Sequence, residues 1–587
     1  MSAAGPGRGL IRQIKTITAL ILTLAGPVLV GLVSGLPSRA QAQSASDYTT
    51  YYTWDTDRRL LMKIGPDPDG SGPALRRTEK YTYDIDGQLI TVQIGTTSTA
   101  AGSDFTALQT VQNSYDLVGN KTQTYSNGAT SAASLTQVKY DANNRPLCTA
   151  VRMNAAAFAG LFAASNSPDA CSLSTAGSAG PDRISKTLFD AAGQTVQTIQ
   201  ALGTADQRTF STYSYSQNGK QVAVTDANNN QTAMTYDGFD RLIRQNFPVT
   251  SRGGGAASAS DYEAYSYDAN GNRLSLRKRD GAVINFAYDG LNRMATKSGA
   301  QIAAVAYAYD LLGRPTLTKF TSGGSGVAYA YDAAGRQVSE TGNLGLKVTY
   351  AYDKAGNRTG ITWPDAVAVA YTYDTAGKMT SVARSGTAAF LTYAYDNLGR
   401  RVSGSYGTAS VTSYGYDAGD RLTQLGHDLP GTTGDVAYGF SFNPAGQLSG
   451  QSVSNPAYVW TPLAQSLTAT ADGLNRDSAI AVAGGYDANQ NLTNDGSRQF
   501  GYDGENRLTA AAGAGTTPIQ ANCNRTSGSP PSRGRRRVEG NPWCCRFAPF
   551  PNIRRALVQT AVYIQAPLMF VQRISARKQR CAKLLGT

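Results

Sequence analysis

The sequence is poor in histidine, charge and cysteine. Of 587 residues, one is histidine, six are cysteine and 16% are charged. The single histidine, His427, excludes a histidine-dependent catalytic triad and any metal site built from several histidines. We expect it in a loop, directly after Leu425 and Gly426. Because 41% of residues are hydrophobic, the low charge does not indicate a disordered polyelectrolyte.

Motifs that bind phosphate or calcium are also missing. The chain has no glycine-rich loop followed by Lys-Ser or Lys-Thr. Asp-rich strings at 67–70, 84–87 and 226–230 resemble calcium loops, but none continues to the bidentate glutamate that such a loop needs. Turn chemistry explains these aspartates. We therefore expect no catalytic residue, no metal, no cofactor and no enzymatic activity.

The net charge of +13 is concentrated at the two ends of the chain. Residues 1–42 carry four basic residues and no acidic one, and residues 516–587 carry 13 basic residues and only Glu539. The part between them has a net charge of −3. This main part has no basic excess with which to bind nucleic acid, and such a partner is not expected.

The N-terminus has the pattern of a signal peptide. Arg8, Arg12 and Lys15 precede an apolar run over 17–33, and Ala40-Gln41-Ala42 forms a small-x-small cleavage site. We expect export to the medium or the cell envelope, with cleavage after Ala42. The alternative is an uncleaved membrane anchor, since 17 apolar residues are just within spanning range. No other run is apolar and long enough to span a bilayer.

A Tyr-Asp motif recurs through the main part of the chain. Fourteen intact pairs and four degenerate copies make 18 units, and Trp54-Asp55 is a candidate worn first copy. From Tyr267 to Tyr416 the copies follow at steps of 21 or 22 residues. A fixed period of this length is the signature of a repeat architecture.

Each unit predicts a hairpin. With the aromatic residue as position one, position five is Gly, Asn or Asp in 17 of 18 copies, the residues that best tolerate a left-handed backbone. Position six is Arg, Lys, Asn or Gln in every copy, as expected for a residue that leaves a turn toward solvent. The Asp at position two can accept hydrogen bonds from amides of the turn.

The residues before the turn alternate, as in Tyr307-Ala308-Tyr309 and Tyr329-Ala330-Tyr331. A period of two places both tyrosines on one face of a strand. Because one hairpin alone is marginally stable, the copies must pack side by side. The sequence therefore predicts an all-β protein of stacked hairpins that form one curved or spiralling sheet. The residues expected to carry this structure are Tyr267, Asp268, Gly271, Tyr288, Asp289, Tyr309, Asp310, Gly313, Arg314, Tyr331, Asp332, Gly335, Tyr352, Asp353, Gly356, Tyr373, Asp374, Gly377, Tyr395, Asp396 and Gly399.

Strings such as Tyr309-Asp310-Leu311-Leu312-Gly313-Arg314 resemble the YD repeats of bacterial Rhs proteins. Related repeats occur in wall-associated proteins, in shell subunits of Tc toxins and in teneurins, and the resemblance covers roughly residues 80–515. It implies a hollow β-sheet cocoon that encloses a C-terminal toxin or other cargo, and thus a shell rather than a catalyst. Family members that release cargo usually carry a closing segment with an Asp-Pro motif after the repeats. Here the only Asp-Pro is Asp67-Pro68, far upstream.

These observations divide the chain into four parts. We expect a signal peptide at 1–42, a lead-in at 43–80, the repeat shell at 81–515 and a basic, Cys-containing tail at 516–587. The tail has no histidine, no aspartate and one glutamate, which argues against a nuclease. It is either a basic segment that binds nucleic acid or membrane, or a disordered or frame-shifted end. We favour the second.

Cys148 and Cys171 are the only cysteines of the main part and flank an Ala/Phe-rich run over 155–165 that can form a helix. In an exported protein, a disulfide that closes this insertion is plausible.

Two functions fit the sequence. The first is an exported, non-enzymatic shell that encapsulates or presents a C-terminal polypeptide, including the remnant of a contact-dependent toxin. The second is an adhesin whose exposed tyrosine faces bind cell-surface sugars or proteins. The direction of the Tyr-x-Tyr face separates them, since an inward face favours a shell and an outward face favours binding.

Overall fold

The computed structural model describes residues 48–513 and 519–520, apart from 71, 129–131, 164–167, 323, 408–409, 432, 460–469 and 477–484. The chain divides into two compact units, 1–45 and 46–587, and every described residue belongs to the second. The expected signal peptide with its cleavage site after Ala42, and the tail except 519–520, lie outside the described residues.

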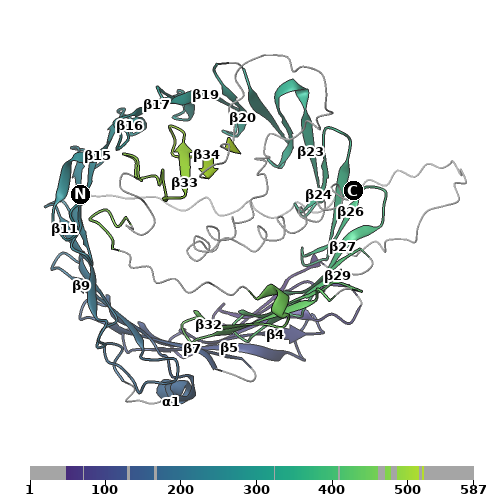
Figure 1. Ribbon diagram of the computed structural model, residues 1–587. Coiled ribbons are helices and arrows are strands. Elements are labelled where there is room, and N and C mark those ends of the chain that lie inside the picture. The colour runs from purple at the N-terminus through teal and green to yellow at the C-terminus, as the bar shows by residue number, and fades with distance from the viewer. Residues whose placement is uncertain are drawn as a thin grey trace, which may run out of the picture. The chain divides into compact units, whose positions relative to one another are not determined.

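Thirty-two strands form one sheet (Figure 1). Their bounds are β1 Tyr51–Trp54, β2 Leu60–Ile64, β3 Arg76–Tyr83, β4 Leu89–Thr97, β5 Thr106–Tyr115, β6 Lys121–Gly128, β7 Ala132–Tyr140, β8 Pro146–Val151, β9 Arg183–Phe189, β10 Thr195–Gln200, β11 Arg208–Tyr215, β12 Gln221–Asp226, β13 Gln231–Tyr236, β14 Leu242–Pro248, β15 Ala257–Tyr267, β16 Arg273–Arg277, β17 Val283–Tyr288, β18 Met294–Gly299, β19 Ile302–Tyr309, β20 Pro315–Phe320, β21 Gly326–Tyr331, β22 Gln337–Thr341, β23 Lys347–Tyr352, β24 Arg358–Thr362, β25 Ala368–Tyr373, β26 Met379–Arg384, β27 Ala389–Tyr395, β28 Arg401–Tyr406, β29 Ser410–Tyr416, β30 Leu422–Asp428, β31 Val436–Phe442 and β32 Leu448–Val453. The remaining elements are η2 Ala155–Ala157, α1 Phe158–Ala163, η3 Asn343–Gly345, η4 Pro456–Tyr458, and a second sheet of β33 Arg498–Tyr502, β34 Leu508–Gly513 and β35 Ile519–Gln520.

The large sheet is an antiparallel meander. Each strand pairs with the next strand in the chain, from β1 with β2 to β31 with β32. Among the described strands, β1 and β32 do not pair with each other, so the sheet is not closed. The expected all-β class of stacked hairpins in a curved sheet is confirmed.

A β-bulge accompanies each Tyr-Asp hairpin. In the β19–β20 pair, Ala308 lies opposite Leu317 while Tyr309 lies opposite Pro315, so one residue of β20 has no counterpart. The same shift recurs at the aromatic residue of the other hairpins. Bulges bend a strand and increase its twist, and their regular recurrence supports the curvature of the sheet in Figure 1.

Strand pairing is found on both sides of the expected repeat region 81–515. It begins at Tyr51, within the expected lead-in of 43–80. The worn copy Trp54-Asp55 forms the same turn as the later copies, with Arg58 at φ 64° in the place of glycine. In the separate three-stranded sheet, β35 pairs with β34, so residues 519–520 of the expected tail also take part in strand pairing. The consensus residues are lost at both ends, but backbone pairing does not require them.

His427 differs from its expected place in a loop. It lies in β30, opposite Thr412 of β29, and its Nδ1 is 3.1 Å from the Thr412 hydroxyl. Burial lowers its pKa. His427 is polar and lies one residue before the end of β30, where the alternation of apolar residues that predicts a strand is weak.

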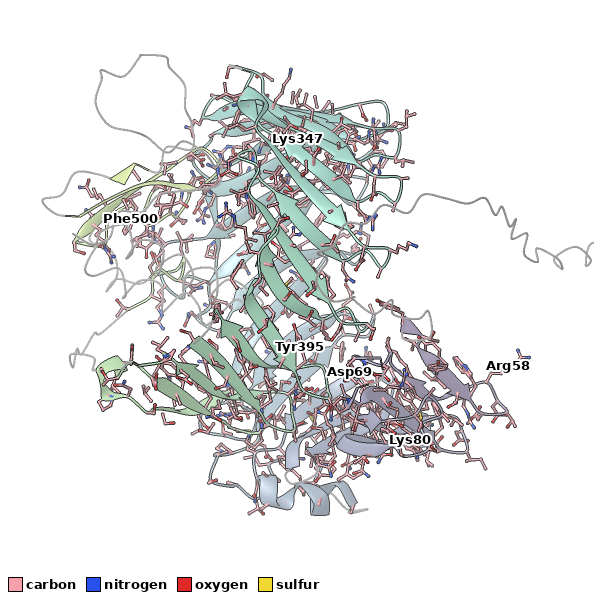
Figure 2. All side chains as sticks on the ribbon, turned by 90° about the vertical axis from the view of Figure 1, so that its right-hand side faces the viewer. Arg58, Asp69, Lys80, Lys347, Tyr395 and Phe500 are labelled. Carbon is pink, nitrogen blue, oxygen red and sulfur yellow. A yellow bond between two sulfur atoms is a disulfide. The ribbon has the colours of Figure 1, made fainter. Side chains whose placement is uncertain are left out.

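Later strands contact the opposite edge of earlier ones. Thr375, in the turn after β25, donates to the carbonyl of Asp67 in the loop after β2. Asp69 of the same loop and Tyr395 of β27 are labelled in Figure 2. Asn475, in a late Tyr-Asp-type turn, donates to Asp226 Oδ2 at 3.0 Å, at the end of β12. We call the side of the chain that carries the Tyr-Asp-type turns the turn edge, and the side that carries the other connections between strands the loop edge. The chain therefore winds so that a later part of the turn edge meets an earlier part of the loop edge.

Candidate functional site: the tyrosine face and the contacts between repeats

The turn of each repeat is held by its own aspartate. In the turn after β17, Asp289 Oδ1 accepts from the backbone N–H groups of Leu291 and Arg293, at 3.0 and 2.9 Å. The position-five residue, here Asn292, has a positive φ in all 18 copies. The expected left-handed turn position is confirmed, and it holds for Gln490, the copy that breaks the Gly/Asn/Asp rule.

The tyrosine of each motif binds the preceding repeat. The Tyr309 hydroxyl donates to the backbone carbonyl of Met294, at 2.9 Å, the first residue after the previous turn. Fourteen motif tyrosines make the equivalent bond, always to position seven of the preceding copy. The tyrosine is therefore a repeat-to-repeat hydrogen bond donor and not only an apolar side chain.

The arginine at position six binds the following repeat. Arg293 donates to Asp289 of its own turn at 2.8 Å and to the Asp310 carbonyl of the next turn at 2.9 Å. Its guanidinium also lies 4.8 Å from the centre of the Tyr309 ring. Eight arginines make both the carbonyl bond and the ring contact. The sequence analysis expected a polar residue that leaves the turn toward solvent, and in these copies the arginine also bridges to the next repeat.

The electrostatics of the turns follow from these bonds. The Arg293 side chain and its backbone N–H hold the pKa of Asp289 below its ordinary value. Asp374 is an exception, because burial raises its pKa. It precedes Thr375, which contacts the loop after β2. Burial and the carboxylate of Glu340 raise the pKa of Tyr350, on the tyrosine face, to about 12.

Two contacts show which way the tyrosines face. In β7, Leu135 packs with Tyr125 against Phe158 of α1, and alternation places Tyr140 on the opposite face from Leu135. Figure 1 shows α1 on the convex side of the sheet. The motif tyrosine therefore faces the concave side.

The second contact agrees with the first. Lys297 of β18 lies opposite Phe286 and Val305, and so shares a face with Tyr288 and Tyr309. Its ammonium pairs with Glu505, in the turn between β33 and β34. Figure 1 shows these two strands within the curve of the large sheet. The rows of tyrosines line the concave side.

The insertion between β8 and β9 (152–182) lies on the convex side. Cys148 and Cys171 are joined by a disulfide with a Cα separation of 5.3 Å. Arg152, with no exposed surface, donates to Asp182 at 2.6 Å and to the carbonyls of Ser172 and Pro168. The sequence indicated a short helical run and a disulfide in this region. No pattern in the sequence indicated the buried ion pair between Arg152 and Asp182.

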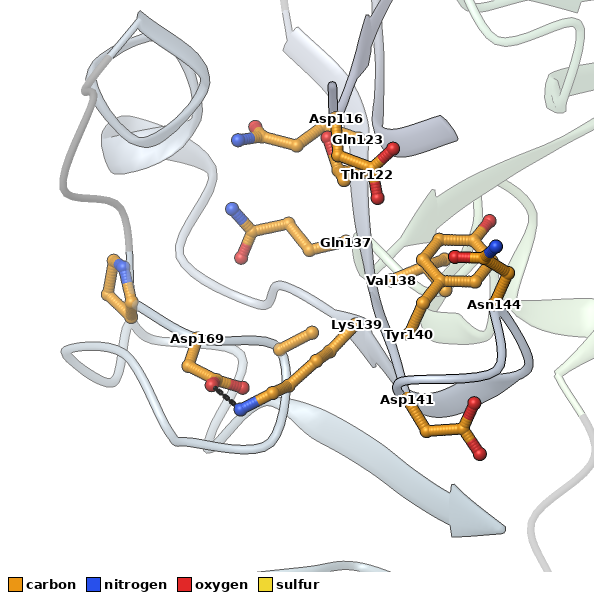
Figure 3. Close-up of a pocket in the computed structure, with 12 residues that line it drawn as sticks. Asp116, Thr122, Gln123, Gln137, Val138, Lys139, Tyr140, Asp141, Asn144 and Asp169 are labelled. Atoms are coloured by element: carbon orange, nitrogen blue, oxygen red, sulfur yellow. Dashed lines mark hydrogen bonds and ion pairs between the residues drawn. The ribbon is translucent and has the colours of Figure 1, made fainter. Parts of the chain in front are cut away.

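A polar pocket of about 390 Å³ lies beside this insertion (Figure 3). Its carboxylates already have structural roles: Asp116 and Asp141 hold turns, and Asp169 pairs with Lys139. The residues that line it include no histidine, serine or cysteine that could act as a nucleophile or base. Within the described ranges, no three His, Cys, Asp or Glu side chains are grouped so that they could hold a metal ion.

Two family models match this repeat sequence. Residues 182–301 match the teneurin YD-shell, and residues 331–368 match the RHS repeat. These two segments are similar to the teneurin YD-shell and to the RHS repeat. The match with the RHS repeat spans β23 and the turn at Gly356, and the YD-shell match runs from β9 to β18.

Among solved structures, the chain is similar to the crystal structure of TcdB2-TccC3-TEV, at 15% identity and a TM-score of 0.46, over 79% of this chain and 23% of that one. It is also similar to the Tc holotoxin pore of Photorhabdus luminescens, at 14% identity and 0.46, over 82% and 22%. The chain thus spans less than a quarter of the length of these proteins. No curated protein matches the sequence. In the part of the chain with a described structure, no helix has the length and apolarity to cross a membrane.

Proposed function

We propose that this YD-shell protein is exported and holds a C-terminal polypeptide on the concave side of its sheet. Residues 1–42 would direct export and be removed after Ala42, and the sheet would act as a structural, non-enzymatic wall. The observation that carries the proposal is the direction of the Tyr-x-Tyr face, which is opposite to the face covered by α1 and the same as the face that contacts the β33–β34 turn.

The winding of the sheet supports the same function. Contacts such as Thr375 with Asp67 join later turns to earlier loops, so that consecutive windings form a continuous wall. An adhesin has less support, because motif tyrosines such as Tyr309 donate their hydroxyls to the preceding repeat and contact an arginine guanidinium with their rings. Little of such a tyrosine is left for an external sugar or protein.

The test is trypsin digestion of the full chain, because residues 516–587 contain 13 lysines and arginines. If the wall holds this segment, its cleavage is slow while the wall is intact. A Thr375→Glu variant places a bulky anion at a buried contact between windings without adding a trypsin site, and it should make cleavage rapid. Equally fast loss of the segment from both proteins would overturn the proposal.

A further inference from the structure

The turn edge of the sheet differs between its first and its later strands. In the strands before β20, one or both of the residues at the tip of several Tyr-Asp turns are large, apolar and exposed. These residues are Ile85, Leu117, Val118, Phe239, Leu291, Leu311 and Leu312. Leu117 and Leu311 are fully exposed. Polar or small residues would serve a turn equally well, so these side chains are not explained by the turn itself.

Several later Tyr-Asp-type turns have small or covered tips. Thr375 is 6% exposed against the loop after β2. Gly473 and Gly504 are buried, and the Gly473 N–H donates to the carbonyl of Thr250 at 2.9 Å in the loop after β14. Leu398, the leucine at the tip of the turn after β27, is partly buried, in contrast to Leu311. A turn edge that faces a loop edge is thus packed, and the early turn edge faces no loop edge among the described residues.

The later loop edge is also uncovered. Leu344, in the loop after β22, is 93% exposed and has a φ of 66°, a strained value for leucine. A hollow of about 560 Å³ lies between this loop and the loop after β20, lined in part by Leu317 and Ala328. Lys278 and Asp280, by contrast, lie in an earlier loop and contact Gly504 and Asn489 of later turns.

We propose that the early turn edge is a docking surface for the late loop edge of a second copy of this chain. The contact continues the one already present inside each chain, in which a turn edge packs on a loop edge. Since the two surfaces are different, association is head-to-tail and produces longer assemblies rather than a closed two-fold dimer. The inference concerns self-association and does not depend on whether a polypeptide is held on the concave side.

Substitutions can be taken from the chain's own turns, so that folding is preserved. The turn-edge variant carries Leu311→Lys and Leu312→Ala, which reproduce Asp353-Lys354-Ala355-Gly356. It also carries Leu117→Ala and Val118→Ala, which reproduce Asp332-Ala333-Ala334-Gly335. The loop-edge variant carries Leu344→Asn, because asparagine tolerates a positive φ. Phe210→Thr, which removes an exposed aromatic side chain within β11, is the matched control.

The measurement is sedimentation velocity of the full chain between about 1 and 100 µM, the range of weak protein association. The unchanged protein and the Phe210→Thr control should sediment faster with rising concentration. Each edge variant alone should remain monomeric, and an equimolar mixture of the two variants should form dimers through its one intact pair of edges.

Each other outcome contradicts the proposal. A monomeric unchanged protein would show that another molecule, or none, covers the turn edge. A mixture that stays monomeric would exclude the head-to-tail geometry. Dimers of the loop-edge variant alone would indicate a two-fold contact between turn edges.

Discussion

The repeat sheet and the β8–β9 insertion (152–182) are stabilised in opposite ways. The insertion has a disulfide, a fully buried ion pair and apolar side chains such as Phe158 in contact with no solvent. The sheet has few buried side chains and instead repeats the same partly exposed contacts from one hairpin to the next. Loss of one contact should therefore lower stability strongly in the insertion and weakly in the sheet, because neighbouring repeats make the same contacts and stabilise one another.

The largest expected effect separates the two regions directly. Arg152→Met leaves Asp182 buried without its cation and should destabilise the insertion by about 3–5 kcal/mol. Arg314→Met removes a partly exposed ion pair with Asp310 and should cost much less, because solvent screens such pairs. Hydrogen exchange of amides in both regions measures this difference. Equal losses of stability in the two variants would show that the insertion does not depend more strongly on a single contact than the sheet does.

Removal of the disulfide should have the next largest effect. Cys148 and Cys171 are 23 residues apart, and a cross-link over such a loop contributes about 3 kcal/mol. In a Cys148→Ser, Cys171→Ser variant, hydrogen exchange should become faster within 152–182 and stay unchanged in β19–β25. Faster exchange throughout the sheet would show that the insertion supports the repeats, contrary to the comparison.

Within the sheet, the largest single effect should come from a turn glycine. Gly356 has a φ of 91°, and an added Cβ meets nothing within 4 Å, so Gly356→Ala tests the backbone alone. The left-handed conformation should cost about 1–2 kcal/mol. Gly360→Ala, in β24 with ordinary contacts, is the control and should change the free energy of unfolding by less than about 0.5 kcal/mol. Urea unfolding measures both, and equal losses would contradict the strain argument.

These contrasts also explain which parts of the molecule the sequence predicts. The period of the Tyr-Asp motif and the Gly, Asn or Asp at position five determine the hairpins, because turn geometry depends on local residues. The bond from Arg293 to the carbonyl of Asp310 was not foreseen, since it depends on how one hairpin lies beside the next. The contact of Thr375 with Asp67 joins residues 308 positions apart, and no local pattern encodes it.

Removing or adding a tyrosine hydroxyl by substitution tests the hydrogen bond between repeats. Tyr309→Phe loses the bond to the Met294 carbonyl and should destabilise that hairpin by about 1 kcal/mol. Phe442→Tyr is the converse change, because position seven of the preceding copy is Leu422, whose carbonyl is the equivalent acceptor. It should slow amide exchange in β30–β31. No change in either variant would mean that the ring, and not the hydroxyl, holds the repeats together.

The smallest expected effect is a difference in pH dependence between two turns. The pKa of Asp289 is lowered in the folded protein, so its contribution to stability is present above the unfolded value of about 3.9 and is lost as pH falls through the folded pKa. The pKa of Asp374 is raised by burial, so its contribution is present below the unfolded value and is lost as pH rises through the folded pKa. At neutral pH, Asp289→Asn should therefore lower the urea midpoint and Asp374→Asn should raise it. Both differences should shrink toward about pH 3, where aspartates become protonated. Changes of the same sign at neutral pH would show that the turn at Asp374 is not desolvated by the winding beneath it, and would remove the distinction between covered and uncovered turns.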